Sequence, residues 1–259
     1  MSVTTIISMY VFLTGLLLGS FFNVCIYRIP RNESIAFPPS HCPNCGYKLS
    51  GWDLIPVCSY LFLRGQCRKC KNKISLQYPI VELLTAILFL CIYLKYGLAW
   101  KTLFLIFLSS ILIIASFIDF EHKIIPDQLV IAGLIVGALF VILQIQKPFY
   151  DLLLGFLIGG GSLFLMGILS LFLFKKEGMG GGDIKLMAVI GLFLGTKLTI
   201  VALLFSIYIG GFFGILLLIL RLKKLQEAIP FGPFIAIGTI ASLFWGNELI
   251  HWYVQRFLL

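Results

Sequence analysis

Long apolar stretches that contain no charged side chain recur along the chain. Four of them cover residues 1–27, 102–118, 152–174 and 198–220. A helix needs about 20 mainly apolar residues to cross about 30 Å of hydrocarbon. Helices are expected, because lipid leaves unpaired backbone groups unsatisfied and these stretches lack the polar alternation of a barrel strand. The pattern therefore predicts an all-α, polytopic membrane protein.

The complete hydropathy pattern predicts about eight transmembrane helices. The sixth is short for a membrane span, and the seventh follows it almost at once. Within these segments glycines recur at four-residue spacing, which allows helices to approach closely, and packing within the chain is favoured over a dimer interface. The predicted spans are residues 5–27, 80–98, 102–118, 128–145, 152–174, 184–196, 198–220 and 229–250.

The composition supports this reading. Hydrophobic residues make up 60% of the 259 residues and charged residues 12%, against about 45–50% and about 25% in a typical soluble domain. These values exclude an ordinary cytosolic enzyme, a disordered protein and a secreted disulfide scaffold.

The basic residues predict the orientation of the spans. Fifteen of the 20 lysines and arginines lie in the connections 28–73, 119–127, 175–185 and 221–227. By the positive-inside rule these connections face the cytoplasm, and both termini lie outside. The net charge of +9 is then mostly a consequence of topology, and no nucleic-acid partner is expected.

The one sizeable polar segment, residues 28–79, contains two C-x-x-C pairs. They are Cys42/Cys45 and Cys67/Cys70. Each pair can place two thiolates on one turn, and four thiolates complete a tetrahedral zinc site with no open position for substrate. Two disulfides are the alternative, but a cytoplasmic loop lies in a reducing compartment. We predict a small cytoplasmic module that binds structural zinc and depends on it for stability.

Two aspartates lie where the predicted topology places the cytoplasmic ends of spans. Asp119 ends the third span, and Asp183 opens the sixth after a glycine run that includes Gly180 and Gly182. Two carboxylates in a poorly hydrated site share a proton, so one can activate water while the other polarises a peptide carbonyl. Glycine beside them would let a peptide approach closely. This combination predicts an aspartic protease.

Other readings of these aspartates remain open. A lone aspartate at a helix end is usually a cap, and Asp127 after Pro126 fits that role. A membrane transporter could use Asp119 and Asp183 as a proton relay. A structural scaffold of a membrane machine would tolerate the loss of both.

The sequence resembles the type IV prepilin peptidases, which are bifunctional leader peptidases and N-methyltransferases with a G-x-G-D motif. The resemblance covers essentially the whole chain, including both C-x-x-C pairs and both aspartates. The stretches that carry it are 19–30 (GSFFNVCIYRIP), 74–83 (ISLQYPIVEL), Asp119 with 125–127 (IPD), 180–183 (GGGD) and 230–234 (PFGPF).

The resemblance implies that Asp119 and Asp183 form the catalytic pair. It also implies cleavage of prepilin and pseudopilin leaders after a glycine at the cytoplasmic face, followed by methylation of the new amino terminus from S-adenosylmethionine. The expected partners are these substrates, the lipid bilayer and the pilus or secretion assembly machinery, and the expected location is a bacterial inner or plasma membrane.

The resemblance further suggests how the chain is divided. Residues 1–27 form the first transmembrane helix, residues 28–79 a zinc-type loop linked to methyltransferase activity, and residues 80–259 a membrane-embedded peptidase domain. No soluble methyltransferase domain is visible, so the methyl donor must bind near the first loop. Asn23, Arg28 and Glu82 are the candidates.

Overall fold

A computed structural model describes residues 2–143, 148–175, 178–221 and 229–257. Within these ranges the protein is helical, with only two isolated antiparallel bridges and no extended strand. Among the described residues every predicted span contains a helix, so the all-α prediction is confirmed; residues 144 and 145 of the fourth predicted span lie outside the described residues. The long helices are α1 (Val3–Arg28), α3 (Gln77–Tyr96), α4 (Trp100–His122), α5 (Asp127–Leu143), α6 (Phe149–Phe174), α7 (Gly181–Leu194), α8 (Thr196–Ile219) and α9 (Gly232–Phe257).

Six of these helices are long and apolar enough to cross a membrane: α1, α3, α4, α6, α8 and α9. The helix α5 is apolar but has 17 residues, and α7 has 14. The chain is therefore a multi-pass membrane protein, and the short sixth segment is confirmed as a short helix.

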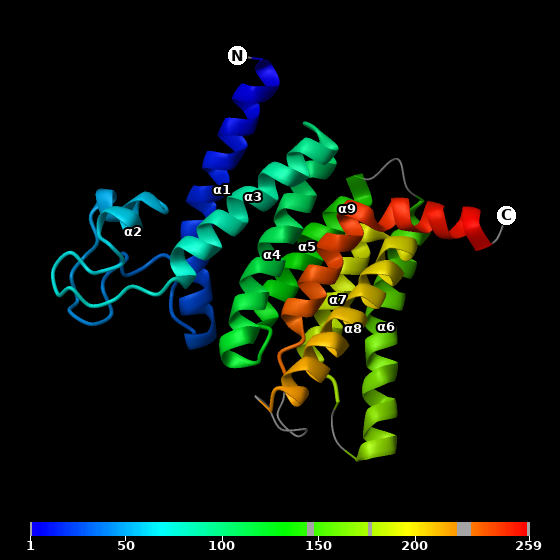
Figure 1. The fold of residues 1–259 in the computed structure, drawn as a ribbon. Helices are drawn as coiled ribbons and strands as arrows, with labels where there is room; N and C mark the ends of the chain where they lie inside the picture. Colours follow the sequence, from blue (N-terminus) through cyan, green and yellow to red (C-terminus); the bar gives the residue numbers. More distant parts are fainter. Residues whose placement is uncertain (1, 144–147, 176–177, 222–228, 258–259) are drawn as a thin grey trace. The chain divides into compact units, whose positions relative to one another are not determined.

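The chain divides into two compact units, with the boundary between Ile106 and Phe107 inside α4. In the first unit α1 and α3 pack side by side (Figure 1). A Cβ on Gly15 would lie 2.6 Å from the Ala86 Cα, so only glycine allows this close approach.

The connection between α1 and α3 contains three short helical elements. They are η1 (Ile29–Arg31), η2 (Gly51–Leu54) and α2 (Cys58–Phe62). A connection this long without a hydrophobic core of its own needs other ties to hold its shape.

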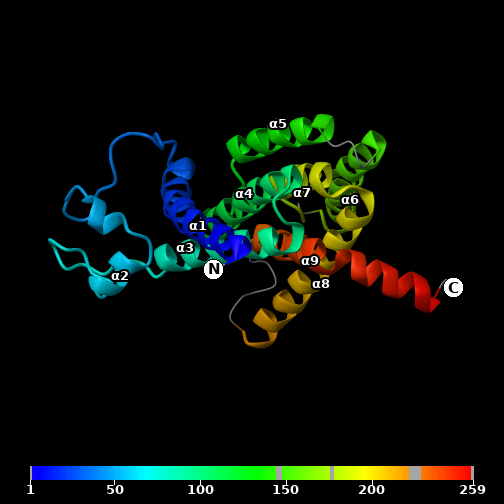
Figure 2. The same ribbon diagram turned by 90° about the horizontal axis from the view of Figure 1, so that it is seen from above.

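In the second unit α7 is the central helix and contacts α5, α6, α8 and α9 (Figure 2). Its packing on α6 depends on glycine: a Cβ on Gly191 would lie 2.1 Å from the Gly155 carbonyl oxygen, and one on Gly159 would lie 2.4 Å from that of Met187. The predicted role of the spaced glycines in packing within the chain is confirmed at these positions. A short helix enclosed in this way can present the residues of its first turn at a fixed position.

Candidate active site and cysteine cluster

Asp119 lies in the last turn of α4 and is only 5% exposed. Its Oδ2 accepts a 2.8 Å hydrogen bond from the backbone N–H of Gly232, the first residue of α9. The contact joins residues that are 113 positions apart in the sequence. One oxygen of this carboxylate is therefore held by the start of another helix.

Asp183 lies in the first turn of α7 and is 9% exposed. It interacts electrostatically with Asp119, so the structure brings the two predicted aspartates to one site within the second unit. Its Oδ1 is buried and has no hydrogen-bond partner among the described residues. An unpaired buried carboxyl oxygen costs free energy and is typical of a group that acts on a ligand.

The glycines before Asp183 belong to the helix start and not to a free loop. Gly180 is the N-cap of α7, and a Cβ there would lie 2.9 Å from Oδ2 of Asp183. A Cβ on Gly182 would lie 2.8 Å from the Cβ of Ile125. No atom lies within 4 Å of a Cβ on Gly181. The prediction that α7 begins at residue 184 was therefore late by three residues.

Asp127 is the first residue inside α5, and its carboxylate forms a 2.6 Å ion pair with Lys185 of α7. Both side chains are more than half exposed. Such an exposed pair contributes little to stability, so it marks the surface near α7 and not the catalytic centre.

One residue of this site was missed at the sequence level. The stretch 230–234 is part of the resemblance, but no role was predicted for Gly232. Its backbone N–H contacts Asp119 because α9 begins there. A glycine beside prolines indicates a helix start in the sequence, but it does not indicate that Asp119 is the hydrogen-bond partner.

In the first unit the four predicted cysteines come together. Their sulfur atoms all lie within 4.8 Å of one another, with 3.8 Å between Cys42 and Cys70 and 4.0 Å between Cys45 and Cys67. Tetrahedral zinc with bonds of about 2.3 Å separates its sulfur ligands by about 3.8 Å, whereas a disulfide needs about 2.05 Å. All four are free thiols. The cluster therefore fits a tetrahedral metal ion and not a pair of disulfides.

Each C-x-x-C pair sits on a tight turn of the same kind. The N–H of Cys42 donates to the Tyr47 carbonyl at 2.9 Å, and the N–H of Cys67 donates to the Asn72 carbonyl at 2.8 Å. In addition, backbone N–H groups of Cys70 and Lys69 lower the pKa of the Cys67 thiol to about 6. At Cys67 the turn therefore favours the thiolate form, which is the form that binds metal.

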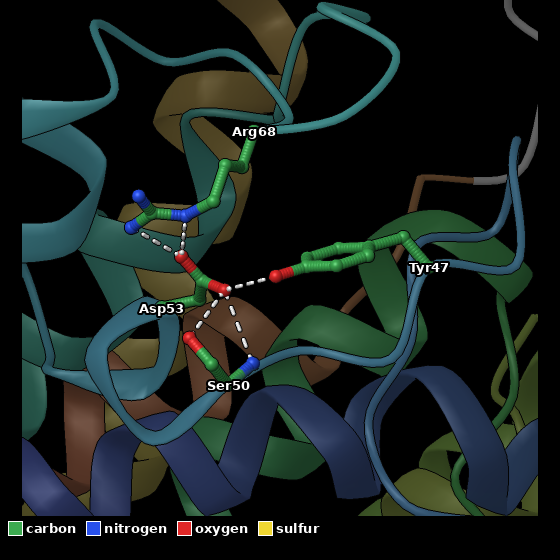
Figure 3. Close-up of polar contacts among 4 residues, drawn as sticks. All are labelled: Tyr47, Ser50, Asp53 and Arg68. Atoms are coloured by element: carbon green, nitrogen blue, oxygen red, sulfur yellow. Dashed lines mark hydrogen bonds and ion pairs between the residues drawn. The ribbon is translucent and has the colours of Figure 1, made fainter.

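The carboxylate of Asp53 connects the two turns (Figure 3). Its Oδ2 accepts hydrogen bonds from Ser50 Oγ at 2.8 Å, Ser50 N at 3.0 Å and Tyr47 Oη at 3.4 Å. Its Oδ1 accepts from Arg68 Nε at 2.8 Å. Tyr47 follows the first cysteine pair and Arg68 lies inside the second. Burial raises the pKa of Asp53, but the hydrogen bonds of Ser50 and Arg68 and the charge of Arg68 outweigh it, and the pKa is lowered.

Of the three candidates for the methyl-donor site, Asn23 links α1 to α3, whereas Arg28 and Glu82 tie the connection to these helices. Asn23 donates through Nδ2 to the Tyr78 carbonyl at 3.1 Å, and Arg28 donates to the Ser34 carbonyl at 2.8 Å. Glu82 accepts a 2.7 Å hydrogen bond from the backbone N–H of Val57 in the connection. All three are buried.

Two family models match the chain. The bacterial peptidase A24 N-terminal domain matches residues 13–96, and the type IV leader peptidase family matches residues 106–215. No solved structure matches the chain significantly.

Curated relatives named prepilin leader peptidase/N-methyltransferase match nearly the whole chain. The Aeromonas hydrophila protein is 36% identical, with 96% of this chain and 94% of the relative covered. The Pseudomonas aeruginosa protein is 34% identical, with 94% and 92% covered. The Bacillus subtilis protein is 36% identical, with 95% and 98% covered.

Proposed function

Because the chain belongs to the prepilin leader peptidase/N-methyltransferase family, we propose that Asp119 and Asp183 are the carboxylates that remove the leader. One observation carries this assignment. Two buried aspartates, from the end of α4 and the start of α7, interact at one site, and one of them has a buried oxygen without a partner. Prepilins are the substrates that the family activity implies.

The proposed chemistry is that of a shared-proton pair. The ionised carboxylate takes a proton from water while the water oxygen bonds to the carbonyl carbon of the scissile peptide. The protonated carboxyl gives its proton to the carbonyl oxygen, which produces a neutral tetrahedral diol. When the C–N bond breaks, the leaving nitrogen receives the proton that the first carboxylate took from water and becomes the new amine. One hydroxyl of the diol returns its proton to the second carboxylate, so the pair is restored. Atoms and charges balance without an added co-reactant.

The leader is cut after a glycine at the cytoplasmic face. Support for the orientation comes from the connections that hold 15 of the 20 basic residues, which include those next to Asp119 and Asp183. A glycine at the cut would let the substrate backbone extend between the two carboxylates. The same orientation places both termini outside and the cysteine cluster in the reducing cytoplasm.

The methyl transfer belongs to the first unit. Zinc held by Cys42, Cys45, Cys67 and Cys70 would stabilise the connection, because four thiolates leave no open coordination position for catalysis. S-adenosylmethionine would supply the methyl group, which would pass from its sulfonium sulfur to the new amine nitrogen as that nitrogen loses a proton. The residues proposed for the methyl-donor site, Asn23, Arg28 and Glu82, lie near the ends of α1 and α3 that the connection joins.

The direct test uses the purified full chain in detergent with a prepilin-like peptide and S-adenosylmethionine. Mass spectrometry separates loss of the leader from gain of a methyl group. We expect Asp119→Asn and Asp183→Asn to insert normally and to lose cleavage, while both still methylate a peptide supplied without its leader. Full cleavage by either variant would contradict the catalytic pair. Proton flux through proteoliposomes without any cleavage would favour the transporter.

A further inference from the structure

The start of α9 carries a backbone donor that is aimed at the catalytic site. Gly232 is the first residue of the helix, and its N–H donates to Oδ2 of Asp119 at 2.8 Å. The first N–H groups of a helix have no partner inside the helix, so they are available to an external acceptor. A carboxylate at a helix N-terminus is also favoured by the partial positive charge there.

The space at this position admits only glycine. A Cβ on Gly232 would lie 2.8 Å from Oδ2, 3.3 Å from Cγ and 3.2 Å from Cβ of Asp119. The first distance is shorter than real Cβ contacts, so any larger residue must displace the carboxylate or the helix start. Pro233 follows and has no N–H of its own, which the first turn of a helix tolerates.

The residues on either side of Gly232 fix the helix start. The Phe231 carbonyl accepts the N–H groups of Phe234 and Ile235, which closes the first turn. Both phenylalanine rings lie against Gly210 of α8, where a Cβ would come within 3.0 Å of Phe231 and 3.3 Å of Phe234. The Phe234 ring also stacks on Phe213 with 5.8 Å between centroids. The donor is therefore held by packing on α8 and not by its hydrogen bond alone.

We propose that Gly232 is a positioning residue for leader removal and that it assigns the roles of the two aspartates. This inference rests on the proposed catalytic pair. The Gly232 N–H holds Oδ2 of Asp119, so Oδ1 is the oxygen that takes the proton from water. Asp183, whose Oδ1 has no partner among the described residues, gives its proton to the peptide carbonyl oxygen. The start of α9 is then a third component of the peptidase site.

The test compares Gly232→Ala with Gly211→Ala in the purified full chain. Gly211 also lies in a helix of this unit, but a Cβ there meets no atom within 4 Å. We expect Gly232→Ala to lower kcat for leader removal about 100-fold, because displacing a catalytic group by about 1 Å can cause a loss of this size. KM should change less than threefold, because the substrate is still bound. Methyl transfer to a peptide without its leader should stay within twofold in both variants.

Cleavage by Gly232→Ala within threefold of wild type overturns the proposal. An equal loss of both activities also overturns it, because that result describes general destabilisation. If Gly232→Ala does not accumulate in membranes, Gly210→Ala carries the test, since it displaces the two phenylalanines without touching Asp119. We then expect a lower kcat with methyl transfer retained, and unchanged cleavage contradicts the role. Retained cleavage by Asp119→Asn instead contradicts the catalytic pair itself.

Discussion

The backbone N–H of Val57 donates a 2.7 Å hydrogen bond to Oε2 of Glu82. Val57 has φ 61° and ψ −51°, and the N–H of Cys58 reaches back to the Pro56 carbonyl at 2.6 Å, so Val57 is the centre of a γ-turn. This conformation is rare and strained for a β-branched residue, at a cost of about 1–3 kcal/mol. Glu82 therefore holds a strained turn of the connection against α3.

This contact makes it possible to test whether Glu82 holds the connection in place or acts directly on the methyl donor. A glutamine side chain keeps an oxygen that can accept the Val57 N–H, so Glu82→Gln should methylate within about threefold of wild type. Glu82→Ala leaves a donor without its partner, which costs about 1–3 kcal/mol, and methyl transfer should fall together with protection of the connection against proteolysis. If Glu82→Gln loses methyl transfer while the connection remains protected, the carboxylate acts on the donor directly.

The three glycines before Asp183 should differ in their tolerance of alanine. A Cβ on Gly180 meets the Asp183 carboxylate and one on Gly182 meets Ile125, whereas one on Gly181 meets nothing within 4 Å. We expect Gly180→Ala and Gly182→Ala to lower leader cleavage at least about tenfold, because each displaces the first turn of α7. Gly181→Ala should cleave like wild type. Measured rates that fall equally in all three variants would show that the turn needs flexibility and not space.

Apolar runs predicted the eight helices, and the spacing of the C-x-x-C pairs predicted the cysteine cluster, because both are local properties of the sequence. The positions of Asp119 and Asp183 at helix ends followed from the predicted topology. The partner of Asp119 could not be predicted in this way. Gly232 reaches it only through the packing of α9, and a backbone N–H leaves no mark on residue type. The buried role of Glu82 was hidden for a similar reason: its partner is the backbone of Val57, in a turn that valine does not signal.

The cysteine cluster predicts one zinc ion per chain. Metal analysis of protein purified in reducing buffer should show this stoichiometry, and Cys67→Ser should lose the metal. Cys58→Ser is the matched control, because Cys58 lies in the same connection, is exposed and is not part of the cluster. Protein without zinc whose connection still resists proteolysis would contradict a structural metal.

Asp53 should control how firmly the metal is held, although it is not a ligand. Its carboxylate is 2% exposed and joins Tyr47 and Ser50 to Arg68, so Asp53→Asn removes the charge that holds both cysteine turns (Figure 3). Mutation of residues that support the metal ligands typically lowers the affinity for the metal about 10- to 100-fold. We expect a chelator to remove zinc from Asp53→Asn at least about tenfold faster than from wild type. Glu33→Gln, an equivalent change at an exposed acid of the same connection, should release zinc at the wild-type rate.

The pH dependence of this effect follows from the lowered pKa of Asp53. A carboxyl whose pKa is lower in the folded state stabilises that state fully above its unfolded pKa of about 3.9. The stabilisation is lost only as pH falls through the lower folded value. The ratio of the zinc-release rates of Asp53→Asn and wild type should therefore stay constant from about pH 6 to about pH 8, because Asp53 stays ionised throughout this range. A difference that disappears near neutral pH would contradict the carboxylate as its origin.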